Sequence, residues 1–160
     1  MRQIPLFNPY MAPDVKKELS KTLDSGFIGT GEKVEGFEKA FASYIGTRYA
    51  VATNSGSAAL HIAARIAGTG QGFAVPSFTY ASTAQCAEYL DEIIMWMDID
   101  PETLCCKHIE GRLPLIPIIM HYGGQPCDMD EFGDLHIEDC AHAIGAEFKC
   151  RKLGSFGEFG

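Results

Sequence analysis

The chain has 160 residues, of which 46% are hydrophobic and 21% are charged, a composition typical of globular proteins that excludes a disordered or fibrous chain. Thirteen basic and 21 acidic residues give a formal net charge of -8 at pH 7, and a field of that sign repels nucleic acids and anionic membranes. We therefore expect one domain over 1–160 that binds neither nucleic acid nor membrane.

The sequence carries no recognisable membrane span or secretion signal. No window approaches the roughly 20 consecutive apolar residues of a membrane helix, and residues 1–10 lack a charged-then-apolar pattern. The six cysteines include no CxxC pair, which is typical neither of a zinc site nor of a secreted disulfide framework. We expect a cytoplasmic protein whose cysteines are reduced and mostly buried.

The first part of the chain alternates between helix and strand patterns. Apolar residues at helical spacing predict helices over 15–23 and 34–45, each followed by a glycine that ends the pattern. A short apolar run predicts a strand over 49–53, and helix-forming residues predict a helix over 58–67. The polar segment 54–57 separates the two, so the order is strand, glycine turn, helix.

The rest of the chain repeats this alternation, although the segment 128–132 is too short for a full crossover helix. The patterns predict strands over 73–76, 93–97, 115–120 and 135–137, a helix over 79–90 and a hairpin over 146–153. Strands separated by helices pair in parallel through right-handed crossovers. We therefore predict an α/β fold with a mostly parallel sheet and helices on both faces.

Ligands bind beyond the carboxyl ends of the strands in such sheets, and the first candidate is the turn 54–57. The free N–H groups of a helix's first turn, the glycine Gly56 and the hydroxyl of Ser57 together make an anion site. An ordinary helix cap also explains these residues. The turn alone leaves phosphate binding and capping open.

Aromatic and histidine side chains follow two other predicted strands. Tyr80 stands in the first turn of the helix predicted over 79–90, where its ring either stacks on a planar ligand or belongs to the core. The segment 121–124, His-Tyr-Gly-Gly, either contacts a substrate or shapes a turn. Neither segment decides the function by itself.

The most informative segment is 136–142, which contains Asp139 and His142. A carboxylate at the end of a buried strand needs a cation or several donors, because an unpaired buried charge is costly. Asp139 therefore indicates a bound cation, a protonated ring nitrogen, or a helix cap that accepts the N–H groups of residues 141 and 142. Metal binding by His136, Asp139 and His142 would need one helix, whereas Ile137 indicates a strand, so we expect no metal here.

Together these segments resemble the DegT/DnrJ/EryC1/StrS family of sugar aminotransferases over nearly the whole chain. The matching segments are 26–31 with Val34 and 37–38, 50–60 (AVATNSGSAAL), 75–80 (VPSFTY), 98–101, 121–126 with 128–129, 137–143 (IEDCAHA) and 154–157. Each segment is short, but their common order is specific. The family uses pyridoxal 5'-phosphate on the aspartate aminotransferase fold. The resemblance thus implies the large domain of a fold-type I pyridoxal-phosphate enzyme over 1–160.

The resemblance also implies a role for each candidate residue. By position, Gly56 and Ser57 would bind the cofactor phosphate, Tyr80 would stack on the pyridine ring, Asp139 would pair with the ring nitrogen and His142 would lie beside the ring hydroxyl. The family moves an amino group from an amino acid such as glutamate to a nucleotide-linked keto sugar, and it works as homodimers with the active site between subunits.

Several features of the family are missing between residues 1 and 160. The resemblance places the Schiff-base lysine after Gly160, so we expect no catalytic residue in the chain, and the small C-terminal domain is also missing. Lys149 and Lys152 match the family's hairpin instead. The segment 128–136 lacks the family's helix, which predicts exposed apolar surface that a partner buries or that lowers solubility. We expect a chain that is incomplete as a catalyst and is complemented by a second copy or by a C-terminal chain.

Three alternatives remain open. The first is a binding or assembly module that keeps the fold without catalysis. The second is a sugar dehydratase of the same family, in which the lysine is replaced. The third is a metal-dependent hydrolase. Saturable binding of pyridoxal phosphate would separate a cofactor-binding protein from an assembly module.

Overall fold

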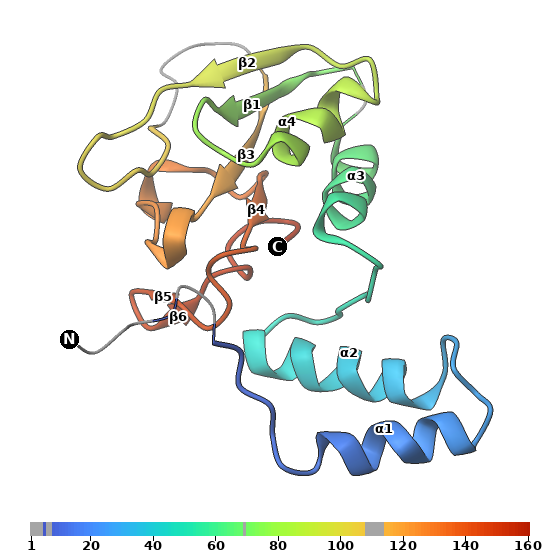
Figure 1. Cartoon of the computed structure of the whole chain (residues 1–160). Coiled ribbons are helices and arrows are strands. Elements are labelled where there is room, and N and C mark those ends of the chain that lie inside the picture. The colour runs from blue at the N-terminus through green and yellow to red at the C-terminus, as the bar shows by residue number, and fades with distance from the viewer. Residues whose placement is uncertain (1–4, 6–7, 69, 108–113) are drawn as a thin grey trace. The chain divides into compact units, whose positions relative to one another are not determined.

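The computed structural model describes residues 5, 8–68, 70–107 and 114–160, and its chain divides into two compact units with the boundary between Phe37 and Glu38. The first unit contains α1 (Val15–Asp24) and the start of α2 (Glu32–Ile45), which ends in the second unit (Figure 1). Apolar residues at helical spacing precede the glycine that ends each helix. The helices predicted over 15–23 and 34–45 are confirmed.

The second unit is built on a four-stranded sheet with the strand order β2-β1-β3-β4, in which every neighbouring pair is parallel. The strands are β1 (Phe73–Pro76), β2 (Ile94–Met97), β3 (Ile116–Met120) and β4 (Ile137–Asp139). Helix α3 (Gly56–Ala67) precedes β1, and α4 (Ala81–Glu88) connects β1 to β2 (Figure 1). The predicted α/β fold with its parallel sheet is confirmed.

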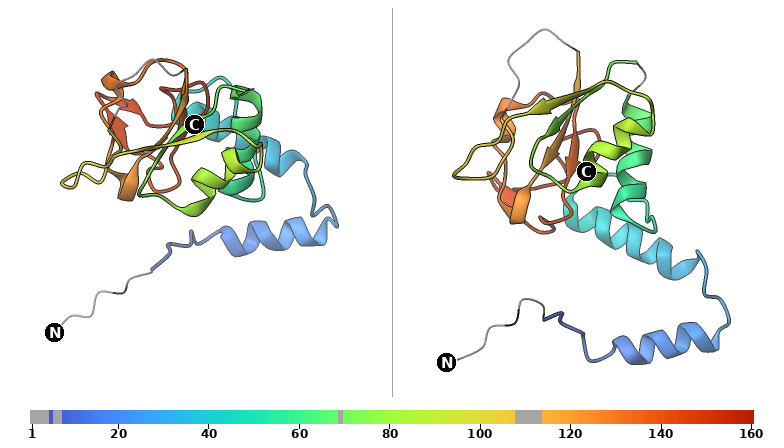
Figure 2. Two further views of the ribbon diagram at one scale, coloured as in Figure 1. Left: turned by 90° about the horizontal axis from the view of Figure 1, so that it is seen from above. Right: turned by 45° about the horizontal axis from the view of Figure 1, so that its top comes forward.

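The two faces of this sheet are buried against different elements. In β3, Ile116 and Ile118 belong to the cluster that packs against α3 and α4, which lie together beside the sheet (Figure 2). Ile119 belongs to a second cluster that includes Met129 of the short 3-10 helix η2 (Met129–Glu131). Successive strand residues point to opposite faces. Full burial of a side chain such as Ile118 contributes about 1.5–3 kcal/mol to folding.

The strand predicted over 49–53 is wrong. Residues 49–53 have no strand conformation, and Tyr49 and Val51 are 72% and 78% exposed. A strand needs a neighbouring strand to satisfy its backbone, and the described strands supply none here. The backbone N–H of Ala52 instead donates to the carboxylate of Glu38 at 2.8 Å.

The C-terminal part contains the predicted hairpin, made of β5 (Glu147–Phe148) and β6 (Arg151–Lys152) in antiparallel pairing. Beyond it, the chain returns to β4, because the N–H of Glu138 donates to the carbonyl of Phe159 at 2.8 Å. Between β3 and β4, the structure forms only the turn η1 (Tyr122–Gly124) and η2, so the predicted lack of a crossover helix over 128–132 is confirmed. Among the residues described, no helix is long and apolar enough to cross a membrane.

Candidate functional site

The loops that follow β1, β3 and β4 lie side by side, because these strands are parallel neighbours. One ring from each loop forms a row. The ring centroids of Phe78 and Tyr122 are 4.6 Å apart, and those of Tyr122 and His142 are 5.5 Å apart. The backbone N–H of Gly123 donates to Nδ1 of His142 at 3.4 Å. The structure therefore brings the predicted residue His142 to the segment 121–124.

Asp139 is the last residue of β4 and is only 6% exposed. Its Oδ2 accepts a hydrogen bond of 2.9 Å from Thr83 Oγ1, and its Oδ1 accepts one of 3.2 Å from the N–H of Ala141. The cap interpretation is right about the N–H of residue 141 but wrong about a helix, because residues 141–145 form turns. Within the described part of the chain, no Lys, Arg or His forms an ion pair with Asp139. This buried carboxylate has two donors, and a cationic ligand group would complete its environment.

The turn before α3 is both a helix cap and open to solvent. Ser55 is the cap, and its Oγ accepts the N–H of Ala58 at 3.2 Å. Gly56 and Ser57 are the first two residues of α3 and are exposed, so the helix begins earlier than predicted. Their N–H groups have no partner within a helix, which leaves them free for an anion. No hydrogen bond among the described residues joins this turn to Asp139, so a shared site stays a prediction.

Tyr80 occupies the N-cap position of α4 and is 72% exposed. A core residue would be covered by its neighbours, so the interpretation of Tyr80 as a core residue is wrong. Phe78, two residues earlier, is 45% exposed. Both rings lie between the end of β1 and the start of α4, where they are accessible to a planar ligand.

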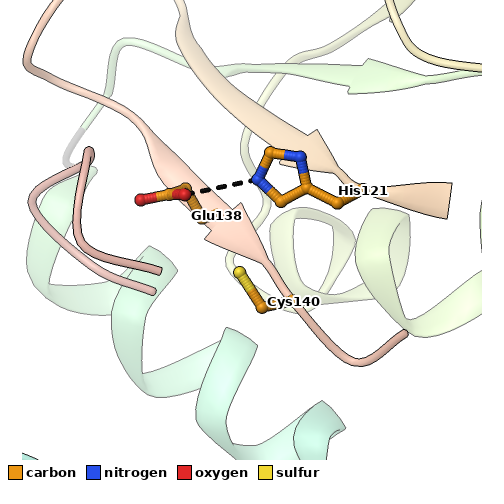
Figure 3. Close-up of side chains that lie close together, drawn as sticks. All are labelled: His121, Glu138 and Cys140. Atoms are coloured by element: carbon orange, nitrogen blue, oxygen red, sulfur yellow. Dashed lines mark hydrogen bonds and ion pairs between the residues drawn. The ribbon is translucent and has the colours of Figure 1, made fainter. Parts of the chain in front are cut away.

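Glu138, beside Asp139 in β4, is a second buried carboxylate, and the sequence analysis missed it. It is 2% exposed. It accepts a hydrogen bond from His121 Nε2 at 3.3 Å (Figure 3). It also accepts hydrogen bonds from the backbone N–H groups of Gly154 at 2.7 Å, Phe156 at 2.6 Å and Gly157 at 2.8 Å. Burial raises the pKa of Glu138, but these hydrogen bonds lower it by more, so the pKa lies below its usual value. Glu138 thereby holds the glycine-rich segment 154–157 against the end of β3.

A metal ion does not fit this cluster, although Cys140 lies beside it (Figure 3) and the three ligand atoms are within 4.8 Å of one another. The backbone N–H of Cys127 donates to His121 Nδ1 at 3.2 Å, so the ring proton is on Nε2. That nitrogen donates to Glu138 and has no lone pair for a metal. The cluster is therefore structural.

The metal trio considered in the sequence is not assembled. Among the described residues, the metal-compatible group contains neither His136 nor Asp139 nor His142. His142 is exposed and bonded to Gly123, whereas His136 is buried and its Nδ1 contacts the carbonyl of Gly133. Asp139 ends β4 and His136 directly precedes this strand, so the helix that the trio would need is not formed.

The six cysteines form no disulfide in this structure and four of them are buried, so the predicted mostly buried state is confirmed, and their reduced state stays a prediction. Two of the buried ones, Cys105 and Cys106, line a surface pocket whose other lining residues include Pro126, Asp128 and Phe148. None of the predicted cofactor residues lines that pocket. It is therefore separate from the strand ends that follow β1, β3 and β4.

The DegT/DnrJ/EryC1/StrS aminotransferase family matches residues 9–160. The chain belongs to this family. It is 36% identical to the spore coat polysaccharide biosynthesis protein SpsC of Bacillus subtilis, over 95% of this chain and 44% of SpsC. The family resemblance inferred from the sequence is confirmed.

The fold of this chain is also similar to that of solved enzyme structures. The aminotransferase from Psychrobacter cryohalolentis is 27% identical with a TM-score of 0.83, over 93% of this chain and 42% of its own. The E. coli GDP-4-keto-6-deoxy-D-mannose-3-dehydratase with bound hydrated PLP is 25% identical with a TM-score of 0.87, over 98% and 46%. The chain thus spans less than half the length of these relatives.

Proposed function

We propose that this chain is the cofactor-binding part of a pyridoxal-phosphate-dependent aminotransferase that acts on a nucleotide-linked keto sugar. The buried carboxylate of Asp139 is the observation that carries this proposal, because it has two donors but no cationic partner within the described residues. A protonated ring nitrogen would supply the missing charge. The family of the chain and the PLP in the E. coli relative support this choice of cofactor.

The remaining candidate residues suit the other parts of the cofactor. Gly56 and Ser57 offer first-turn N–H groups and a hydroxyl to the phosphate. Tyr80 offers an exposed ring for stacking. His142 accepts the Gly123 N–H at Nδ1, so in its neutral form Nε2 carries the proton and can donate to the ring hydroxyl. When bound, the cofactor supplies an electron sink for the reacting carbon of the substrate.

The amino donor in this proposal is an amino acid such as glutamate, and the acceptor is the keto group of the sugar. A sugar dehydratase is the second candidate, because the E. coli relative is named as one. Both candidates use the same residues around Asp139, and they differ in the group that the cofactor transfers or removes.

Titration of the full chain with pyridoxal 5'-phosphate and with pyridoxamine 5'-phosphate tests the proposal. The second probe lacks the aldehyde that reacts with surface lysines, so calorimetry reports binding to the ring and phosphate site. We expect saturable binding with a stoichiometry of one. In Asp139→Asn, loss of the charge-assisted hydrogen bond should weaken pyridoxamine phosphate binding by about tenfold or more.

Asp134→Asn is the matched control, because Asp134 is exposed, precedes the same strand and loses the same charge. Its affinity should equal that of the unchanged chain. No saturable binding, or equal weakening by the two substitutions, would contradict the proposed function and favour the assembly module.

A further inference from the structure

A chain of two threonine hydroxyls leads to Asp139 from the loop after β1. Thr83, in the first turn of α4, is fully buried and its Oγ1 lies 2.9 Å from Asp139 Oδ2. Thr79 precedes α4, and its Oγ1 lies 2.9 Å from that of Thr83. This hydrogen bond connects α4 with the end of β4, because Asp139 lies 56 positions after Thr83 in the chain.

The direction of these hydrogen bonds follows from their chemistry. An ionised carboxylate only accepts, so the single proton of the Thr83 hydroxyl is donated to Asp139. Thr83 Oγ1 is then an acceptor toward Thr79, whose hydroxyl must donate. A helical threonine commonly bonds to a carbonyl three or four residues earlier in its own helix, and Thr83 bonds to a carboxylate on another element instead.

We propose that Thr83 is a positioning residue, which fixes the carboxylate of Asp139 so that it faces the ring nitrogen of the bound cofactor. This inference rests on the proposed function. Thr83 holds Oδ2 and the Ala141 N–H holds Oδ1, so both oxygens of the carboxylate are oriented before the cofactor enters. Each oxygen keeps a lone pair for the ring N–H. Thr79 supports the arrangement by orienting the Thr83 hydroxyl.

The test replaces the hydroxyl while keeping its shape. Thr83→Val should weaken pyridoxamine phosphate binding by about fivefold, the usual effect of one hydrogen bond, and Thr83→Ser should restore it. The signature is the chemical shift of a ¹⁵N-labelled ring nitrogen, followed against pH by NMR. In Thr83→Val the bound ring nitrogen should lose its proton at a lower pH, whereas Thr83→Ser should titrate like the unchanged chain.

Thr47→Val is the matched control, since the Thr47 hydroxyl bonds to the carbonyl of Tyr49 and, among the described residues, to no carboxylate. If Thr83→Val does not fold, Thr79→Val and Thr83→Ser carry the same comparison. An unchanged chain that binds no pyridoxamine phosphate would overturn the proposed function and this inference together. Binding that Asp139→Asn weakens but that Thr83→Val leaves unaltered, with the same ring titration, would overturn the role of Thr83 alone.

A second inference concerns two thiols and is independent of the cofactor. The sulfur atoms of Cys106 and Cys127 are 3.9 Å apart, and the residues are 5% and 0% exposed. Cys106 lines the surface pocket described above, so a small molecule in that pocket would lie beside this residue. Cys127 also donates its N–H to His121, the partner of Glu138. The hydrogen bond with Cys127 lowers the pKa of Cys106 despite its burial, which favours Cys106 as the attacking thiolate.

We infer that Cys106 and Cys127 form a reversible disulfide in exchange with a low-molecular-weight disulfide. The Cys106 thiolate attacks one sulfur of that molecule and releases a first thiol. Cys127 then loses its proton and attacks the Cys106 sulfur of the mixed disulfide, which releases a second thiol. The protein pair loses two electrons and two protons, and the small disulfide gains them as two thiols.

Treatment of the full chain with oxidised glutathione, followed by alkylation and peptide mapping, tests this inference. We expect a linked pair of peptides that contain Cys106 and Cys127 and that dithiothreitol separates. Cys127→Ser should abolish the linked pair, and the matched variant Cys86→Ser, at a buried thiol of the other core cluster, should retain it. Modification confined to the exposed Cys150, or a link that uses Cys105, would overturn the inference.

Discussion

At the scale of single residues, the two adjacent carboxylates of β4 have opposite tasks. Glu138 is saturated by four donors from the chain itself, whereas Asp139 has two and faces the strand ends. Alternation along the strand separates them, because neighbouring side chains point to opposite faces. One carboxylate therefore stabilises the fold and the other remains available to a ligand.

Glu138→Gln should destabilise the chain by about 2–4 kcal/mol. The amide NH₂ of glutamine would replace one carboxylate oxygen, so the N–H groups that donate to that oxygen would face another donor. The pH dependence has a defined sign. The folded pKa of Glu138 is lowered, so its stabilisation is complete above the unfolded pKa of about 4.3 and is lost as the pH falls through the lower folded value. Denaturant unfolding from pH 7 down to pH 3 measures both effects, and the variant should lose part of this acid dependence.

Glu147→Gln is the control for this prediction, because Glu147 is exposed and its pair with Lys152 lies on the surface of the hairpin. It should change the free energy of unfolding by less than about 1 kcal/mol. A Glu138→Gln variant as stable as this control at pH 7 would show that the segment 154–157 does not depend on Glu138.

The sequence predicted site residues whose role follows from their neighbours in the chain, and it missed residues whose partners are far away in the chain. A carboxylate at the end of an apolar strand was enough to single out Asp139. Thr83 and Glu138 were missed because their partners lie 56 and 16 or more positions away, at distances that no local pattern reports. The adjacent acidic pair in a buried strand, followed by a glycine-rich segment, was the available signal for Glu138.

At the scale of elements, apolar periodicity predicted the helices and strands that bury one apolar face. β1 has the predicted bounds, and the helices and the hairpin were found within a few residues. The segment 49–53 has the same apolar character as β1 but lacks a neighbouring strand in the described part of the chain. A strand is defined by its neighbour as well as by its own residues. The composition of a segment therefore predicts its tendency to form a strand, and a strand forms only where a neighbouring strand pairs with it.

At the scale of the whole molecule, apolar side chains remain on the surface. The exposed apolar surface predicted from the missing helix over 128–136 is wrong for the sheet, because Ala74, Met97 and Ile119, which share a core cluster with Met129, are at most 4% exposed. The exposed position lies in β2, where Trp96 is 58% exposed. β2 is at the edge of the described sheet, with β1 as its neighbour. Edge strands with exposed apolar residues favour association between chains.

We expect Trp96→Lys to reduce self-association of the chain, because a charge at an edge strand opposes pairing and removes a large apolar contact. Sedimentation velocity over a range of concentrations measures the effect, and the unchanged chain should shift toward larger species as its concentration rises. Ile66→Lys adds the same charge at an exposed apolar position of α3, 64% exposed and away from the sheet edge. Equal effects of the two substitutions would mean that general apolar exposure, and not the edge of the sheet, drives association.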